Sequence, residues 1–144
     1  MTYDLPSVKD YMKKDLASIS SEASALEASK VMVKKNMGYL IVLENGKPVG
    51  IMTEKDLIIK VMSAEKDPKK VKASQVMSSP LVTVDPDNDI SKAIDVMKKH
   101  SFRRLPVVKS GIIYGVFTAE DLVDHFDEFE NSMWRDIVRF FPFR

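Results

Sequence analysis

Residues 8–57 and 73–122 of this 144-residue chain are copies of one another that align without a gap. Thirteen aligned pairs are identical, whereas average residue usage predicts about three by chance. The identical pairs include Met12/Met77, Gly50/Gly115, Thr53/Thr118 and Asp56/Asp121. A duplicated unit of this size leaves one face of its sheet uncovered, so we expect the two copies to pack together as one module.

The hydrophobic periods follow the same order in both copies and predict β-α-β-β-α. In each copy a short strand precedes an amphipathic helix, two strands joined by a tight turn, and a second helix. The predicted elements are the first strands 16–20 and 81–84, the helices capped by Ser24 and Asp89, the hairpins turning at Asn45-Gly46 and Ser110-Gly111, and the second helices that begin at Thr53 and Thr118.

The predicted fold class is α/β (α+β): two repeats related by a pseudo-twofold axis, followed by a C-terminal amphipathic helix. The chain divides into repeat 1 at residues 1–64, a linker at 65–72, repeat 2 at 73–128 and an aromatic tail at 129–144. The linker is rich in charged residues and contains Pro68, so we expect it to be solvated.

Composition argues against several classes of protein. With 22 Lys and Arg against 21 Asp and Glu, the net charge is +1, which disfavours nucleic acid and membrane as partners. The chain has no cysteine, and its histidines are only His100 and His125, so no disulfide and no metal site is expected. No nucleophile has a recognisable base partner, so we predict no catalytic residues, no catalytic cofactor and no enzymatic activity. The sequence shows no leader pattern and no apolar run of about 20 residues, so the expected location is cytoplasmic.

The most chemically suggestive pattern is glycine, two apolar residues, threonine, two further residues and aspartate. It occurs at residues 50–56 and again at 115–121. One interpretation is a helix cap, in which the Thr oxygen accepts a helix N–H and the carboxylate is favoured by the helix dipole. The other is a binding site, in which the helix start and the Thr hydroxyl face a phosphate and the Asp accepts both hydroxyls of a ribose. Both interpretations remain open on spacing alone.

The duplication, the β-α-β-β-α order and the twin Thr/Asp pattern resemble a stand-alone tandem pair of CBS (cystathionine β-synthase) domains, a Bateman module, over residues 7–128. The resemblance implies a regulatory module that binds AMP, ADP, ATP or S-adenosylmethionine in the cleft between the repeats and signals to a separate protein partner. It also implies that Asp56 and Asp121 bind the ribose, Thr53 and Thr118 the phosphate, and Ser18, Ile19, Thr83 and Val84 the base.

Basic residues distinguish the two copies. Copy two contains Arg103-Arg104-Leu105-Pro106, which resembles the family's motif before the second strand, and His100 lies close by in the sequence. These side chains are either solvated or reach the phosphates, since a guanidinium pairs well with phosphate oxygens. Copy one lacks both arginines and the proline, so we expect one strong site and one weak or empty site.

The tail beyond repeat 2 has no counterpart in copy one. Its apolar residues fall on one stripe of a helix: Met133, Trp134, Ile137, Val138 and Phe141. That stripe must be buried against its own module, a second subunit of a homodimer or another protein. The alternative function is therefore a ligand-independent interaction or scaffold protein that acts through this aromatic helix.

Overall fold

The computed structural model describes residues 6–125, which form two compact units. The central unit runs from Asp15 to Val82, and the terminal unit combines the chain up to Lys14 with the chain from Thr83 onward. Within residues 6–125, none of the helices is both long enough and apolar enough to span a bilayer. The predicted C-terminal helix at 129–144 lies outside the described residues.

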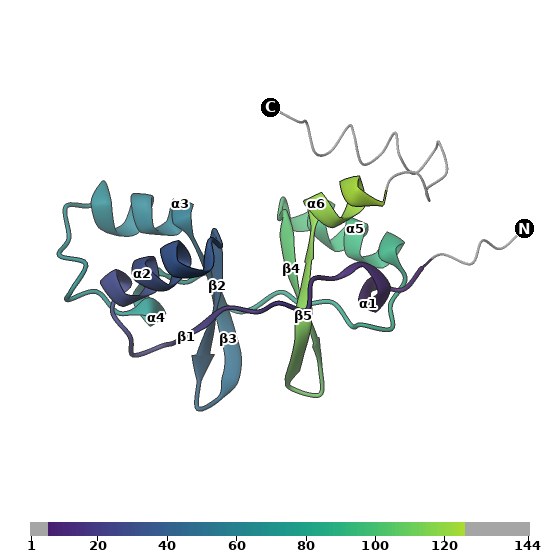
Figure 1. Ribbon diagram of the computed structural model, residues 1–144, viewed down its shortest axis with the longest axis horizontal. Coiled ribbons are helices and arrows are strands. Elements are labelled where there is room, and N and C mark those ends of the chain that lie inside the picture. The colour runs from purple at the N-terminus through teal and green to yellow at the C-terminus, as the bar shows by residue number, and fades with distance from the viewer. Residues whose placement is uncertain (1–5, 126–144) are drawn as a thin grey trace, which may run out of the picture. The chain divides into compact units, whose positions relative to one another are not determined.

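The central unit contains a three-stranded sheet in the order β1-β2-β3. Strand β1 (Ser18–Ser20) runs parallel to β2 (Tyr39–Glu44), which pairs antiparallel with β3 (Lys47–Thr53) through the predicted Asn45-Gly46 turn. Helices α2 (Ala25–Lys35) and α3 (Glu54–Leu57) lie on the same side of this sheet (Figure 1). A π-helical turn (Ile58–Met62) extends α3, and α4 (Ala73–Val76) follows the linker.

The core of the central unit is apolar and lies between its sheet and its helices. Its buried side chains include Ala28, Met32, Leu40, Val42, Met52 and Val61. The predicted cap is present, because Ser24 accepts the backbone N–H of Glu27 at 3.1 Å. At the other end of α2, Asn36 adopts the left-handed conformation. The periodicity of the sequence therefore corresponds to real helix faces.

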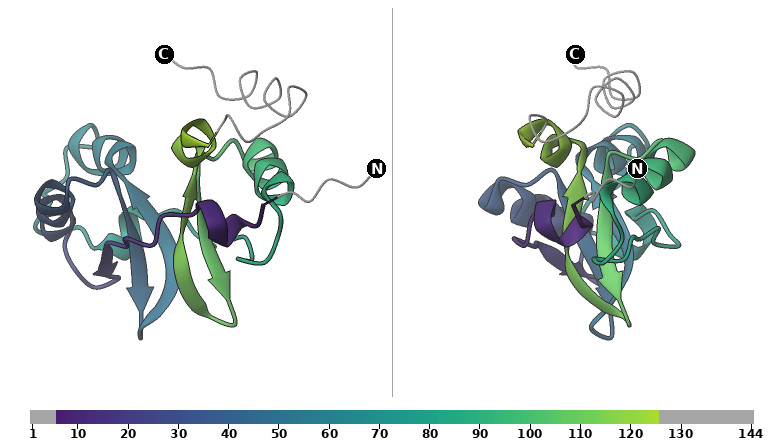
Figure 2. Two further views of the ribbon diagram at one scale, coloured as in Figure 1. Left: turned by 45° about the vertical axis from the view of Figure 1, so that its right-hand side comes forward. Right: turned by 90° about the vertical axis from the view of Figure 1, so that its right-hand side faces the viewer.

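The terminal unit repeats this plan with one strand fewer. Strands β4 (Arg104–Lys109) and β5 (Ile112–Thr118) form an antiparallel hairpin. The accompanying helices, α1 (Val8–Tyr11), α5 (Ile90–His100) and α6 (Ala119–Asp124), are shown from a second direction in Figure 2.

The predicted first strand of copy two, 81–84, is reduced to a single parallel bridge between Val84 and Val107. In copy one the N–H of Ser21 donates to Leu43 at 2.8 Å and extends the ladder beyond β1. The corresponding residue of copy two is Pro86, which has no N–H to donate, so the same extension cannot form. This part of the secondary-structure prediction was wrong for that reason.

The two copies exchange their first segments. Helix α1, from the start of copy one, contacts β5 of the terminal unit, and α4, from the start of copy two, contacts β3 of the central unit. Lys13 bridges Val116 in the terminal unit, and Ser78 makes the corresponding bridge to Ile51 in the central unit. The compact units are therefore assembled from segments that are far apart in the sequence.

This exchange explains why both copies have glycine at one aligned position, Gly50 and Gly115. A Cβ on Gly115 would lie 2.5 Å from the carbonyl oxygen of Lys13 and 2.9 Å from the sulfur of Met12. A Cβ on Gly50 would lie 2.5 Å from the sulfur of Met77. The exchanged segments pass so close to β3 and β5 that only glycine fits there without displacement.

Candidate functional site: twin threonine–aspartate junctions

Each Thr/Asp pattern lies where a strand ends and a helix begins, and each forms a complete capping box. At the first junction the N–H of Thr53 donates to Oδ2 of Asp56 at 2.9 Å, and the N–H of Asp56 donates to the Thr53 hydroxyl at 3.2 Å. At the second, the matching distances between Thr118 and Asp121 are 2.8 Å and 3.2 Å. The capping interpretation is confirmed, and the Thr hydroxyls are engaged in it.

The cap occupies only one oxygen of each carboxylate. The other oxygen, Oδ1, faces a lysine at both junctions: Lys60 Nζ lies 3.9 Å from Asp56, and Lys13 Nζ lies 3.8 Å from Asp121. A carboxylate oxygen beside an ammonium group can accept hydroxyls while the ammonium attracts an anion. Capping therefore leaves each junction with a hydroxyl acceptor and a cation.

The lysines are the members of these junctions that sequence reasoning missed. Lys60 follows Asp56 by one helical turn, a spacing at which side chains meet, so its pairing could have been found. No local pattern links Lys13 to Asp121, because the exchange of the first segments brings Lys13 there.

The electrostatic environment differs between the junctions. The Asp121 side chain is 4% exposed and that of Asp56 is 18% exposed. Burial raises the pKa of the Asp121 carboxyl above its usual value of 3.8, opposed by its hydrogen bonds with Thr118 and by the charge of Lys13. The carboxylate of the second junction is therefore less accessible to water than that of the first.

The residues predicted to enclose a base lie on the first strands. Ser18 is exposed and Ile19 half-buried on β1, where they pair with Ile41 and Val42. In copy two Thr83 is exposed, and Val84 is buried with its N–H donated to Pro106 at 3.0 Å. A role of these four side chains in base binding stays a prediction.

The structure places the two arginines beside the second junction. Arg104 is the strand partner of Thr118, and the carbonyl of Arg103 accepts the N–H of Ala119 at 2.9 Å. The Arg103 guanidinium lies 3.7 Å from the carboxylate of Glu120, with both side chains about half exposed. Pro106 is buried in β4 opposite Val116.

His100 ends α5 and is exposed. Its ring stacks on Phe102 with a centroid separation of 5.3 Å. Between residues 6 and 125, no three His, Asp or Glu side chains cluster in a way that could hold a metal ion.

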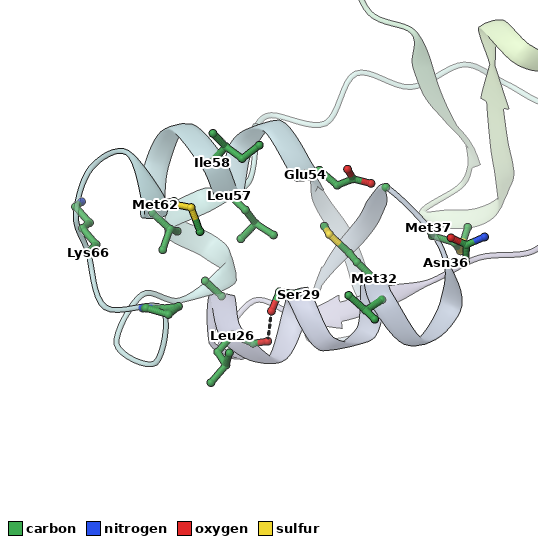
Figure 3. A pocket seen from close by; sticks show the side chains of 15 residues that line it. Leu26, Ser29, Met32, Asn36, Met37, Glu54, Leu57, Ile58, Met62 and Lys66 are labelled. Carbon is green, nitrogen blue, oxygen red and sulfur yellow. Dashed lines mark hydrogen bonds between the residues drawn. The ribbon is translucent and has the colours of Figure 1, made fainter.

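The structure also contains an apolar groove of about 830 Å³ between α2 and the α3/π-helical segment of the central unit (Figure 3). None of the predicted binding residues lines it. The groove is therefore separate from the Thr53–Asp56 junction.

Comparison with known proteins assigns the family. The CBS domain family matches this chain twice, at residues 8–63 and 73–128. A CBS domain-containing protein of Bacillus subtilis, YhcV, is 31% identical over 118 residues, which cover 82% of this chain and 84% of that protein. An uncharacterized protein of Methanopyrus kandleri is 34% identical over 119 residues, 81% of this chain, and the match spans 61% of that relative's length.

Solved structures agree with this assignment. An uncharacterized conserved protein of Pyrococcus horikoshii superposes with a TM-score of 0.78 at 25% identity, covering 87% of this chain and 95% of that one. CBS domain pairs are commonly regulatory ligand-binding modules. The two matched segments, the repeated order of helices and strands and the twin junctions together establish that this chain belongs to the CBS domain family and carries two CBS domains in tandem.

Proposed function

We propose that this protein senses an adenosine-containing ligand, namely AMP, ADP, ATP or S-adenosylmethionine, and passes the signal to a separate partner. The observation that carries the proposal is the Oδ1 oxygen of each junction aspartate, which takes no part in the cap and lies 3.8 Å or 3.9 Å from a lysine Nζ. A ribose offers two hydroxyls to such a carboxylate, and the attached phosphate complements a nearby cation. We place the ligands at these two junctions.

The proposed roles follow the chemistry of each group. Asp56 and Asp121 accept ribose hydroxyls, while Lys60 and Lys13 attract the phosphates. Thr53 and Thr118 hold the aspartates in place through the caps. Arg103 and Arg104, which only copy two possesses, add phosphate contacts at the second junction.

This arrangement favours unequal binding at the two junctions. Asp121 is the more buried carboxylate, so hydrogen bonds made to it are less weakened by water than those made to Asp56. The arginines lie at the same junction. We therefore propose that the Thr118–Asp121 junction binds tightly and the Thr53–Asp56 junction weakly.

Isothermal titration of the nucleotide-free protein with AMP, ADP, ATP and S-adenosylmethionine tests the proposal. Asp121→Asn is expected to weaken the tight site by about 10- to 100-fold, because a hydrogen bond to a charged group is worth about 1.5–3 kcal/mol. Asp56→Asn is expected to affect only the weak site. Asp95→Asn, which changes an exposed carboxylate on α5 of the same unit as Asp121, is the matched control.

Three results would contradict the proposal. They are silence from all four ligands, equal affinity at two sites, or an Asp95→Asn effect as large as that of Asp121→Asn. We further propose that the protein forms a homodimer and binds a separate protein partner. Sedimentation with and without nucleotide measures the oligomeric state. Oligomers occur in this fold, as a hexameric CBS-CP12 protein from bloom-forming cyanobacteria illustrates.

A further inference from the structure

Residues 7–14, here called the N-terminal segment, begin copy one but pack on the terminal unit, where helix α1 contacts β5 (Figure 1). Near the start of this segment, the N–H of Val8 donates to the carbonyl of Asn88 at 2.8 Å. Near its end, Lys13 and Val116 exchange both of their backbone hydrogen bonds, at 2.9 Å and 3.0 Å. Backbone hydrogen bonds therefore hold the segment on the terminal unit at both of its ends.

The end of the N-terminal segment is also where the chain leaves the terminal unit, since the central unit begins at Asp15. Two residues earlier, Nζ of Lys13 lies 3.8 Å from Oδ1 of Asp121. Lys13 is therefore both the cation of the Thr118–Asp121 junction and a member of the segment that continues into the other unit. A change at this junction reaches the segment without any intermediate group.

The Thr53–Asp56 junction is built differently. Its cation, Lys60, lies four residues after Asp56 in the same helical run and does not belong to the exchanged segment. The exchanged segment of the central unit, which contains α4, instead presents backbone carbonyls to Lys60, the nearer being that of Val76 at 2.8 Å. A phosphate drawn to Lys60 would contact the helical run, whereas a phosphate drawn to Lys13 would contact the exchanged segment itself.

We propose that a phosphate-bearing nucleotide at the Thr118–Asp121 junction fastens the N-terminal segment to the terminal unit, with its phosphate on Lys13 and its ribose on Asp121. This inference rests on the proposed function and adds the part of the molecule that responds to the ligand. Without the nucleotide, the side-chain link at this point is one ion pair of 3.8 Å from a half-exposed lysine, which water screens. The nucleotide adds contacts to both members of that pair.

The direction of the effect follows from the two states of the segment. A ligand shifts a conformational equilibrium only by its difference in affinity for the two states. When the segment is docked, the nucleotide contacts both Lys13 and Asp121. When the segment opens, Lys13 leaves with it and the contact with Asp121 remains. The docked state therefore binds the nucleotide more tightly, and the nucleotide makes local opening of the segment rarer.

Amide hydrogen exchange of the full chain, followed by mass spectrometry, measures this opening. AMP, ADP and ATP are each added at a concentration that calorimetric titration shows to be saturating. We expect exchange in residues 8–14 to slow by about three- to fivefold, the size that an ion pair of a half-exposed lysine supports. Residues 73–79 are the matching segment of copy two and serve as the internal reference. Their exchange is expected to stay unchanged, whereas general stabilisation by a ligand would slow both segments.

Two variants of the N-terminal segment separate the ammonium of Lys13 from the rest of the segment. Lys13→Met removes that ammonium and keeps an apolar stem, so the slowing is expected to disappear when the ligand is raised to the same occupancy. Lys14→Met is the matched control, since it removes an exposed ammonium from the next residue, and it should retain the slowing. Circular dichroism identical to that of the wild type confirms that both variants are folded.

The possible results distinguish this proposal from the proposed function. Nucleotide binding that leaves exchange in residues 8–14 unchanged, or slows residues 73–79 equally, would overturn the fastening and leave nucleotide sensing intact. Retention of the slowing in Lys13→Met would do the same. Binding of S-adenosylmethionine alone would also overturn it, because that ligand has no phosphate. Silence from all four ligands in the titration would overturn both proposals.

Discussion

At Thr53 and at Thr118 the same capping box begins a helix, with hydrogen-bond distances that agree within 0.1 Å. The surroundings of the two aspartates nevertheless differ. The Asp56 side chain is 18% exposed and lies beside Lys60, four residues later in the chain. The Asp121 side chain is 4% exposed and lies beside Lys13, near the N-terminus. Duplication preserved the local hydrogen bonds, since these depend on residues three apart. Burial of each carboxylate depends on distant segments, as does the lysine beside Asp121, and these surroundings differ between the two junctions. Four experiments measure how far that difference extends.

The largest effect is expected from filling the glycines beneath the exchanged segments. Gly115→Ala is expected to cost about 3 kcal/mol, because its Cβ would lie 2.5 Å from the backbone oxygen of Lys13. Gly50→Ala is expected to cost about 1–2 kcal/mol, because its nearest neighbour at 2.5 Å is the flexible Met77 sulfur and the backbone oxygen of Ser78 lies at 2.8 Å. Urea unfolding measures both. Equal costs would mean that the two exchanges are packed equally tightly.

The next largest effect is expected from the junction lysines. Lys60→Met removes a hydrogen bond from Nζ to the carbonyl of Val76 at 2.8 Å and is expected to cost about 1.5 kcal/mol. Lys13→Met removes a longer, half-exposed ion pair at 3.8 Å, which solvent screens, so its expected cost is below about 1 kcal/mol. Denaturation midpoints at neutral pH compare them. A larger loss for Lys13→Met would show that burial of Asp121 makes its ion pair the stronger one.

A smaller effect is expected in the pH dependence of stability. Since burial raises the pKa of Asp121, its carboxyl binds a proton more tightly in the folded state than in the unfolded state. Its contribution to the free energy of unfolding is therefore present at pH values below 3.8 and is lost as the pH rises through the raised pKa. Asp121→Asn is expected to remove this decline, as measured by urea unfolding at a series of pH values.

Asp87 provides a control because its pKa is shifted in the opposite direction to that of Asp121. Hydrogen bonds from Lys109 and Lys9 lower its pKa to about 2, so its contribution is present above 3.8 and is lost as the pH falls towards 2. Asp87→Asn should therefore alter only the acid limb of the stability profile. If both variants shifted the profile in the same direction, the burial assigned to Asp121 would not control its titration.

The smallest effect is expected from the ion pair of Arg103, one of the two arginines that only copy two has. Glu120→Gln breaks the 3.7 Å ion pair of Arg103, and because both side chains are about half exposed the stability change should stay within about 0.5 kcal/mol. In copy one the matching residues are Gly38 and Lys55, which cannot form this pair. Thermal unfolding of Glu120→Gln and of the wild type measures this change. A decrease in the free energy of unfolding of more than about 1 kcal/mol would indicate a structural role for Arg103.

Local sequence was sufficient for much of the fold. The caps at Ser24 and Asp89, the glycine turns and the Thr/Asp boxes all depend on residues within a few positions of one another, and the structure contains each of them. Short-range hydrogen bonds and hydrophobic periods are encoded where they act. The order β-α-β-β-α follows from these signals in copy one, while Pro86 weakens the first strand in copy two.

Tertiary structure decided what local patterns could not. The sequence by itself determined the repeats, their order of elements and the candidate carboxylates. Only the fold decided that α1 and α4 exchange places, that glycine is needed at Gly50 and Gly115, and that Lys13 reaches Asp121. The physical reason is that burial and long-range ion pairing depend on segments that meet only in the folded protein. No hydrophobic period or local motif in the sequence indicates that Lys13 and Asp121 will be neighbours.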